Sequence, residues 1–166
     1  MKSKSIRYAD IVRDTIVDGL GLRDTLYVSY CPHNCPGCHN KPLQDKDYGQ
    51  EIELDDLLQL LLESDNHLTL SGGEPMAQAY NLALLVHEYK KHRPDNNIWV
   101  YSGYTFEQII QDEDKLTLLK QCDVLVDGRF EIDKRSLDLK FKGSSNQRVI
   151  DIKKSLQENK VIELEL

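Results

Sequence analysis

The sequence predicts an α/β fold with a mostly parallel sheet. Apolar runs that suit strands alternate with amphipathic runs that suit helices, which is typical of repeated βα units. The strand runs are apolar over most of their length, which indicates burial on both faces of the sheet. At 166 residues the chain can bury a real core, and we expect one domain over residues 1–166. Four or five βα units are too few for a closed eight-stranded barrel.

The first half of the chain is predicted from β-rich and leucine-rich runs. Residues 6–17 mix apolar and charged positions and are expected to form a strand and a turn. After the loop marked by Gly19 and Gly21, residues 26–30 are rich in strand-forming types. Polar connecting sequence follows Asn40. The leucines of residues 53–63 recur at helical spacing, with acidic residues in the first turns that suit the helix dipole.

The second half continues the alternation. His67–Ser71 and Ile98–Tyr101 are predicted strands on either side of a helix over 77–92, which Pro94 to Asn97 would end. Residues 105–120 suit one broken or two short helices, interrupted near Asp112–Asp114. The remaining segments are a predicted strand at 124–127, an extended loop at 132–148 and a late edge strand at 160–166.

Composition narrows the classes of partner. The chain is 40% hydrophobic and 30% charged, with no apolar run long enough to span a bilayer. Its basic N-terminus has no apolar core behind it and is not expected to be a signal peptide. We therefore expect a cytoplasmic protein whose thiols stay reduced and available to metal. The net charge of −7 argues against nonspecific binding to nucleic acid or to an anionic membrane.

Three of the four cysteines fall in one short loop, Cys31-Pro-His-Asn-Cys35-Pro-Gly-Cys38. This C-x3-C-x2-C spacing lets one loop turn three sulfurs toward a common point, and a 4Fe–4S cluster is normally held by thiolates. Three thiolates leave one iron open to a small molecule. A structural zinc site remains an alternative, because His33 or His39 could complete a Cys3His set. Cys122 lies alone in an apolar run and is predicted to be a buried core thiol.

A second motif follows the predicted strand at 67–71. Gly72 and Gly73 would let the backbone approach a ligand closely, because glycine has no Cβ. Glu74 offers a carboxylate to a cationic group, and Pro75 suits the start of the next helix. Both motifs, and Ser102 with Gly103, come directly after predicted strands. In a parallel sheet such positions converge on one edge.

With these motifs the chain resembles the radical S-adenosylmethionine enzymes, and within them the activating proteins of anaerobic ribonucleoside-triphosphate reductase. The resemblance departs at Leu20, where the family usually has proline, and at Ser29-Tyr30, where a glycine is common before the first cysteine. The runs that carry it, besides the two motifs above, are Asp18-Gly-Leu-Gly-Leu-Arg23, Cys35-Pro-Gly-Cys-His-Asn40, Trp99-Val-Tyr-Ser-Gly-Tyr-Thr-Phe-Glu107, Asp123-Val-Leu-Val-Asp-Gly-Arg-Phe-Glu131 and Phe141-Lys-Gly-Ser-Ser-Asn-Gln-Arg148.

The resemblance implies an open partial (β/α) barrel with its site at the carboxyl ends of the strands. It implies a 4Fe–4S cluster held by Cys31, Cys35 and Cys38, with S-adenosylmethionine chelating the fourth iron. The residues expected around S-adenosylmethionine are Gly37, Cys38, His39, Gly72, Gly73, Glu74 and Ser102. Among these, Glu74 is expected near the ammonium group, and Gly37 to His39 near the adenosyl part.

The resemblance also implies the reaction and the partners. A radical made from S-adenosylmethionine would abstract hydrogen from a glycine of the large reductase subunit, with electrons from a donor such as flavodoxin. Two alternatives stay open from the sequence. The chain could act on another glycyl-radical enzyme or on a small molecule, or it could be a zinc-binding module without catalysis.

Overall fold

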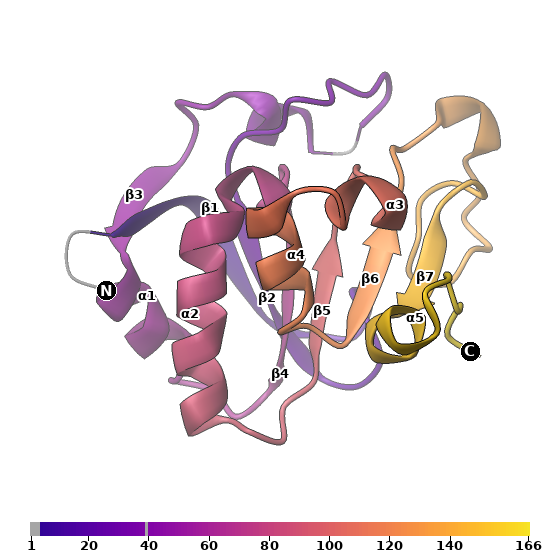
Figure 1. The fold of residues 1–166 in the computed structure, drawn as a ribbon. Helices are drawn as coiled ribbons and strands as arrows, with labels where there is room; N and C mark the ends of the chain where they lie inside the picture. Colours follow the sequence, from indigo (N-terminus) through magenta and orange to yellow (C-terminus); the bar gives the residue numbers. More distant parts are fainter. Residues whose placement is uncertain (1–3, 39) are drawn as a thin grey trace.

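The computed structural model describes residues 4–38 and 40–166, and its strands form a seven-stranded sheet (Figure 1). The strand order is β3-β1-β2-β4-β5-β6-β7. The strands are β1 (Ser5–Thr15), β2 (Arg23–Val28), β3 (Gln50–Glu53), β4 (His67–Gly72), β5 (Ile98–Tyr101), β6 (Val124–Asp127) and β7 (Arg148–Asp151). The α-helices are α1 (Leu54–Leu61), α2 (Ala79–His92), α3 (Phe106–Ile109), α4 (Glu113–Leu119) and α5 (Ile152–Glu158). Short 3-10 helices occur at η1 (Lys41–Gln44), η2 (Pro75–Gln78) and η3 (Ile132–Lys134).

The sheet is mixed, so the expectation of a mostly parallel sheet is only half right. The central pairings β2–β4, β4–β5 and β5–β6 are parallel. The outer pairings β1–β2, β1–β3 and β6–β7 are antiparallel. The parallel centre follows from the helical crossovers after β4 and β5, whereas β7 follows β6 through a loop without an α-helix and therefore returns antiparallel.

The core lies between the sheet and the helices on one face. In Figure 1, α2 and α4 lie side by side across the front of the sheet. Alternate residues of the central strands, such as Leu68, Leu70 and Val100, belong to this large core. The opposite face carries a smaller cluster in which Trp99 and Val126 pack with Phe141 from the loop before β7. Both faces of the central strands are thus covered, as their apolar runs predict.

Most predicted elements are confirmed, including the break between α3 and α4. Pro75 opens η2, which leads directly into α2. The prediction of an edge strand at 160–166 is wrong, because Glu163 makes only an isolated bridge to Ile150. Strands β3 and β7 and helix α5 were not predicted. Cys122 is fully buried, and burial raises the pKa of its thiol to about 12, which confirms a core thiol.

No helix in the described part of the chain is long and apolar enough to cross a membrane.

Candidate functional site

The loops after β2, β4 and β5 meet at the carboxyl ends of the parallel strands. Backbone hydrogen bonds link the first two, from Gly73 N to Val28 O (3.0 Å) and from Glu74 N to Tyr30 O (2.7 Å). Between the loops lies a cavity of about 160 Å³, which we call the cysteine cavity. Its lining residues are Cys31, His33, Cys35, Cys38, Asn40, Ser71, Gly72, Gly73, Tyr101, Ser102, Gly103, Val126, Gly128, Arg129, Phe130 and Gln147.

All three cysteines of the C-x3-C-x2-C loop line this cavity, and none is in a disulfide. The loop is wound tightly, with a turn closed by the bond from Cys38 N to Cys35 O (3.2 Å). Gly37 has a φ of 73°, and a Cβ there would lie 2.5 Å from Ile132 Cδ1. The glycine therefore lets the loop pack against η3.

Burial favours the protonated form of two of the three thiols in this loop, which a metal would have to displace. Burial raises the pKa of Cys31 to about 11, against a smaller opposing effect of a backbone hydrogen bond from His33. Burial also raises the pKa of Cys35, opposed by a backbone hydrogen bond from Phe130. Metal binding at such thiols releases their protons, because the thiolate is the ligand.

Only the His33 form of the zinc alternative concerns the described residues, because His39 lies outside them. Among them, no three His, Cys, Asp or Glu side chains gather closely enough to hold one metal ion. Four thiolates on one zinc ion would lie only about 4 Å apart. In a 4Fe–4S cluster each thiolate binds a different iron, so three separated cysteines around one cavity suit a cluster.

Glu74 lies beneath the cavity and is fully buried. Its Oε1 is 2.6 Å from His33 Nε2 and accepts a hydrogen bond from Gly103 N (2.7 Å). Its Oε2 accepts from Ser102 Oγ (2.9 Å) and Met76 N (2.9 Å). The carboxylate thus has four partners within the chain, and its expected place near an ammonium group stays a prediction. It joins the loops after β2, β4 and β5.

His33 is a site residue that the sequence suggested only as a zinc ligand. Its side chain is 3% exposed, and its ring packs edge-on against Tyr104 at a centroid distance of 4.5 Å. A Cβ on Gly103 would lie 2.5 Å from His33 Cδ2, so the ring fills the space over that glycine. The position between two cysteines marked His33 as close to the site, but its contact with Glu74 depends on a distant loop.

Gly72 and Gly73 line the cavity, but the chain's own packing is what requires glycine there. A Cβ on Gly72 would lie 2.4 Å from Val28 O, and its φ is 119°. A Cβ on Gly73 would lie 2.3 Å from Tyr30 O and 2.9 Å from Leu43 O. The absent side chains therefore let β4 and its loop approach β2 and the cysteine loop. The expected close approach of their backbone to a ligand stays a prediction.

The remaining predicted site residues are placed as follows. Ser102 lines the cavity while its Oγ accepts from Tyr104 N (3.0 Å) and donates to Glu74. His39 lies outside the described residues. Cys38 and Ser102 both line the cysteine cavity. Gly37 does not line it and packs against Ile132.

Comparison with known proteins agrees with this geometry. Residues 17–150 match the family model of a 4Fe-4S single cluster domain. The anaerobic ribonucleoside-triphosphate reductase-activating protein of Pasteurella multocida is 37% identical over 154 residues, which cover 86% of this chain and 95% of that protein. The protein of the same name from Vibrio cholerae is 38% identical over 141 residues, covering 80% and 89% respectively.

The chain belongs to the family of anaerobic ribonucleoside-triphosphate reductase-activating proteins.

A solved structure shares the fold at lower similarity. The structure of QueE from Escherichia coli aligns with a TM-score of 0.53 and 17% identity. The alignment covers 61% of this chain and 53% of that chain, so it spans about half of QueE. It supports the fold alone.

One departure from the usual family pattern has a visible backbone consequence. Tyr30, directly before Cys31, has a φ of 78°, in the left-handed region that favours glycine. The glycine common in this part of other family members would adopt this conformation without strain. Leu20, the other departure, is exposed, and its carbonyl accepts from Arg23 Nη1 (2.6 Å). Neither departure removes a cysteine.

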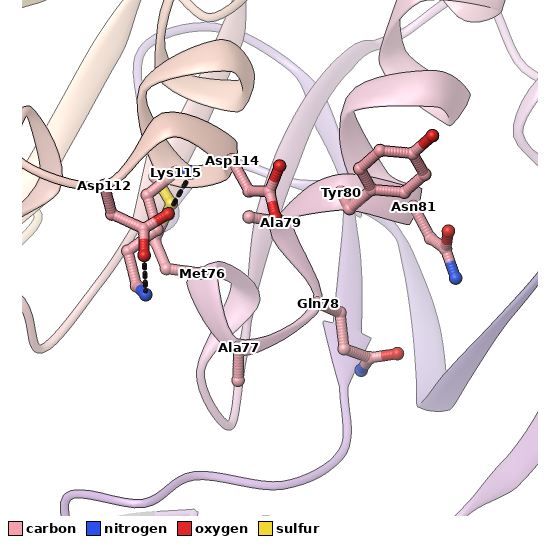
Figure 2. A pocket seen from close by; sticks show the side chains of 9 residues that line it. All are labelled: Met76, Ala77, Gln78, Ala79, Tyr80, Asn81, Asp112, Asp114 and Lys115. Carbon is pink, nitrogen blue, oxygen red and sulfur yellow. Dashed lines mark hydrogen bonds and ion pairs between the residues drawn. The ribbon is translucent and has the colours of Figure 1, made fainter.

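A second hollow lies away from the cysteines, between the start of α2 and the start of α4 (Figure 2). It measures about 460 Å³ and is open. Two of its charged groups pair with each other, because Asp112 caps α4 through Lys115 N (3.0 Å) and pairs with Lys115 Nζ (3.3 Å). We assign this hollow no part in the chemistry of the family.

Proposed function

We propose that this chain is an activating enzyme that reductively cleaves S-adenosylmethionine at a 4Fe–4S cluster and generates a glycyl radical on anaerobic ribonucleoside-triphosphate reductase. The observation that carries the proposal is the cysteine cavity. Three free cysteines of one loop line it together with the glycine pair after β4, in a chain that belongs to the activating-protein family.

Cys31, Cys35 and Cys38 would hold three irons of the cluster. Their number fits a cluster with one iron left for a ligand, and their shared cavity gives that ligand access. When bound and reduced, the cluster supplies one electron to the sulfonium of S-adenosylmethionine, which separates into methionine and a 5′-deoxyadenosyl radical.

The chain would bind and orient S-adenosylmethionine largely through backbone. Gly72 and Gly73 line the cavity beside Ser102, and their backbone would contact the methionine part. The cysteine-loop residues Gly37, Cys38 and His39 would lie near the adenosyl part. Glu74 would act from below, by fixing the loops that carry these groups. Orientation and exclusion of water are the protein's share of such a reaction.

Another cavity, directly beside the cysteine cavity, suits access by a protein segment. It measures about 490 Å³, lies against the cysteine cavity and shares Cys38, Tyr101 and Phe130 with it. We infer that the open sheet forms a partial barrel within a single domain, and that this cavity lies in its interior. A glycine on a reductase loop would approach the site there, and an electron donor such as flavodoxin would supply the electrons.

The cysteine set is tested by separate substitutions after anaerobic reconstitution. Cys31→Ala, Cys35→Ala and Cys38→Ala are each expected to abolish the formation of 5′-deoxyadenosine under dithionite. Cys122→Ala is the matched control and should keep the activity, because its thiol is a core group. Full activity of the Cys35→Ala protein would contradict the proposal.

A further inference from the structure

Two runs of sequence that the proposed chemistry leaves unused bind each other side by side. One is residues 127–131 after β6, and the other is residues 143–148 before and into β7. We call their contact the β6–β7 clasp. The two runs lie antiparallel, and the clasp consists of side-chain hydrogen bonds between them. They are Ser144 Oγ with Glu131 N (3.1 Å), Asn146 Nδ2 with Arg129 O (2.9 Å), Gln147 Nε2 with Gly128 O (2.9 Å) and Arg148 Nη2 with Asp127 Oδ2 (2.6 Å).

The clasp is anchored in the core. Asp127 is 1% exposed, and its Oδ2 also accepts from Phe106 N (2.7 Å). Arg148 reaches Asp127 with Nε and Nη2 and pairs with Glu107 on α3 at 2.7 Å. Gln147 adds bonds from Gly143 N (2.8 Å) and Ser144 N (3.2 Å) to its Oε1. This network holds the backbone of the first run, because Gly128 O, Arg129 O and Glu131 N each have a side-chain partner in the second.

The fixed segment forms one wall of the cysteine cavity. Gly128, Arg129 and Phe130 line it opposite the cysteine loop. Arg129 and Cys35 line this same small cavity, so the guanidinium and the cysteine sulfur belong to one site. In the described part of the chain no ion pair of Arg129 with a carboxylate is found, whereas Arg148 has two. The Arg129 charge is therefore left to act on the cavity.

We propose that the β6–β7 clasp holds Arg129 beside Cys35 so that its positive charge raises the reduction potential of the cluster. The inference rests on the proposed function, since it assumes a cluster on the three cysteines. One-electron reduction makes a cluster more negative, so a nearby cation and N–H donors to the sulfur favour the reduced form. Arg129 is exposed, so salt screens part of its effect.

The test is a redox titration of the reconstituted protein with dithionite, followed by electron paramagnetic resonance. Arg129→Gln is expected to lower the midpoint potential, and Arg129→Lys to shift it much less. The shift between the unaltered and Arg129→Gln proteins should shrink at high salt. Arg93→Gln is the matched control, because Arg93 follows α2 at the opposite end of the sheet and pairs with Asp65. Its potential should equal that of the unaltered protein.

An Arg129→Gln protein that holds its cluster at an unchanged potential overturns the inference. Should that variant take up no cluster, Asn146→Ala is titrated, since it keeps the charge but frees the backbone of Arg129. An Asn146→Ala protein whose midpoint potential equals that of the unaltered protein also overturns the inference. These outcomes leave the proposed function standing, whereas failure of the unaltered protein to bind a cluster would refute the proposed function itself.

Discussion

Glu74 joins three loops through one carboxylate. We expect Glu74→Gln to destabilise the protein by about 1–3 kcal/mol, because an amide replaces one acceptor oxygen with a donor. Either Met76 N or Gly103 N would then face an N–H group. The free energy of unfolding in urea measures this loss. Calorimetry on the reconstituted protein should also show weaker binding of S-adenosylmethionine. Glu74 holds the cysteine loop through His33, and the substitution weakens that contact.

The matched control for this substitution is Glu88→Gln. Glu88 is partly exposed on α2 and pairs with Lys91 at 3.1 Å. Its replacement should change the free energy of unfolding by less than about 0.5 kcal/mol. Equal stabilities of the Glu74→Gln and Glu88→Gln proteins would show that the four contacts of Glu74 contribute little.

Asp24 makes stability depend on pH at the other end of β2. Burial would raise its pKa, but hydrogen bonds from Asn66, Arg13 and the backbone of Asp14 outweigh burial and lower it below its ordinary value of 3.8. A lowered pKa means that the carboxylate stabilises the fold above its unfolded-state pKa. That stabilisation is lost as the pH falls through the lower folded-state value.

We therefore expect Asp24→Asn to cost about 1–3 kcal/mol at pH 7. The difference in unfolding free energy from the unaltered protein should shrink as the pH is lowered from about 5 toward about 3. Urea unfolding at several pH values measures it. A difference that stays constant, or grows, over this range would contradict the assignment.

At the scale of elements, the approach of β4 to β2 depends on the glycine pair. Gly73→Ala should destabilise the fold by about 1–3 kcal/mol, because the new Cβ would meet the backbone carbonyls of Tyr30 and Leu43. Gly143→Ala is the comparison, since its Cβ would come no closer than 3.1 Å to any neighbour, and that neighbour is the side chain of Phe130. Thermal unfolding of both proteins without cofactor decides between the two interpretations. A Gly73→Ala protein as stable as the unaltered one would restore the view that this glycine serves only the ligand.

The predictability of each element follows its local signal. The central strands were predicted because each is an apolar run that lies between loop residues. Strand β3 was missed because Ile52 is its one apolar residue, and it pairs with Ile6 at an edge of the sheet. Helix α5 has seven residues, and Asp151 caps it through Lys154 N, a signal easily taken for a loop.

The site was predictable as far as its residues are close in sequence. The cysteine spacing and the strand ends placed Cys31 and Gly72 at one edge of the sheet. The partners of Glu74 were not predictable, because His33 and Gly103 reach it from separate loops, 41 and 29 residues away. The sequence supplies the carboxylate, and the packing of three loops decides what it binds.

At the scale of the whole molecule, charge bears on docking. Arg148 has a structural part, because it pairs with Asp127 and Glu107. Arg135 is exposed and lines the cavity of about 490 Å³ beside the cysteine cavity. The protein as a whole is acidic. We expect Arg135→Gln to weaken binding to the large reductase subunit severalfold at low salt and less at high salt. Affinity measured across a salt series tests this, with Arg93→Gln as the control that should match the unaltered protein.

The proposed activity of this chain is to make a glycyl radical on another protein. The most direct measurement mixes the reduced, reconstituted protein with S-adenosylmethionine and the large subunit of the anaerobic reductase, and records the electron paramagnetic resonance spectrum. We predict a glycyl-radical doublet that requires all three components and is absent with the Cys35→Ala protein. Cleavage of S-adenosylmethionine without any doublet would contradict the account and favour a radical enzyme that acts on a small molecule or on another glycyl-radical enzyme.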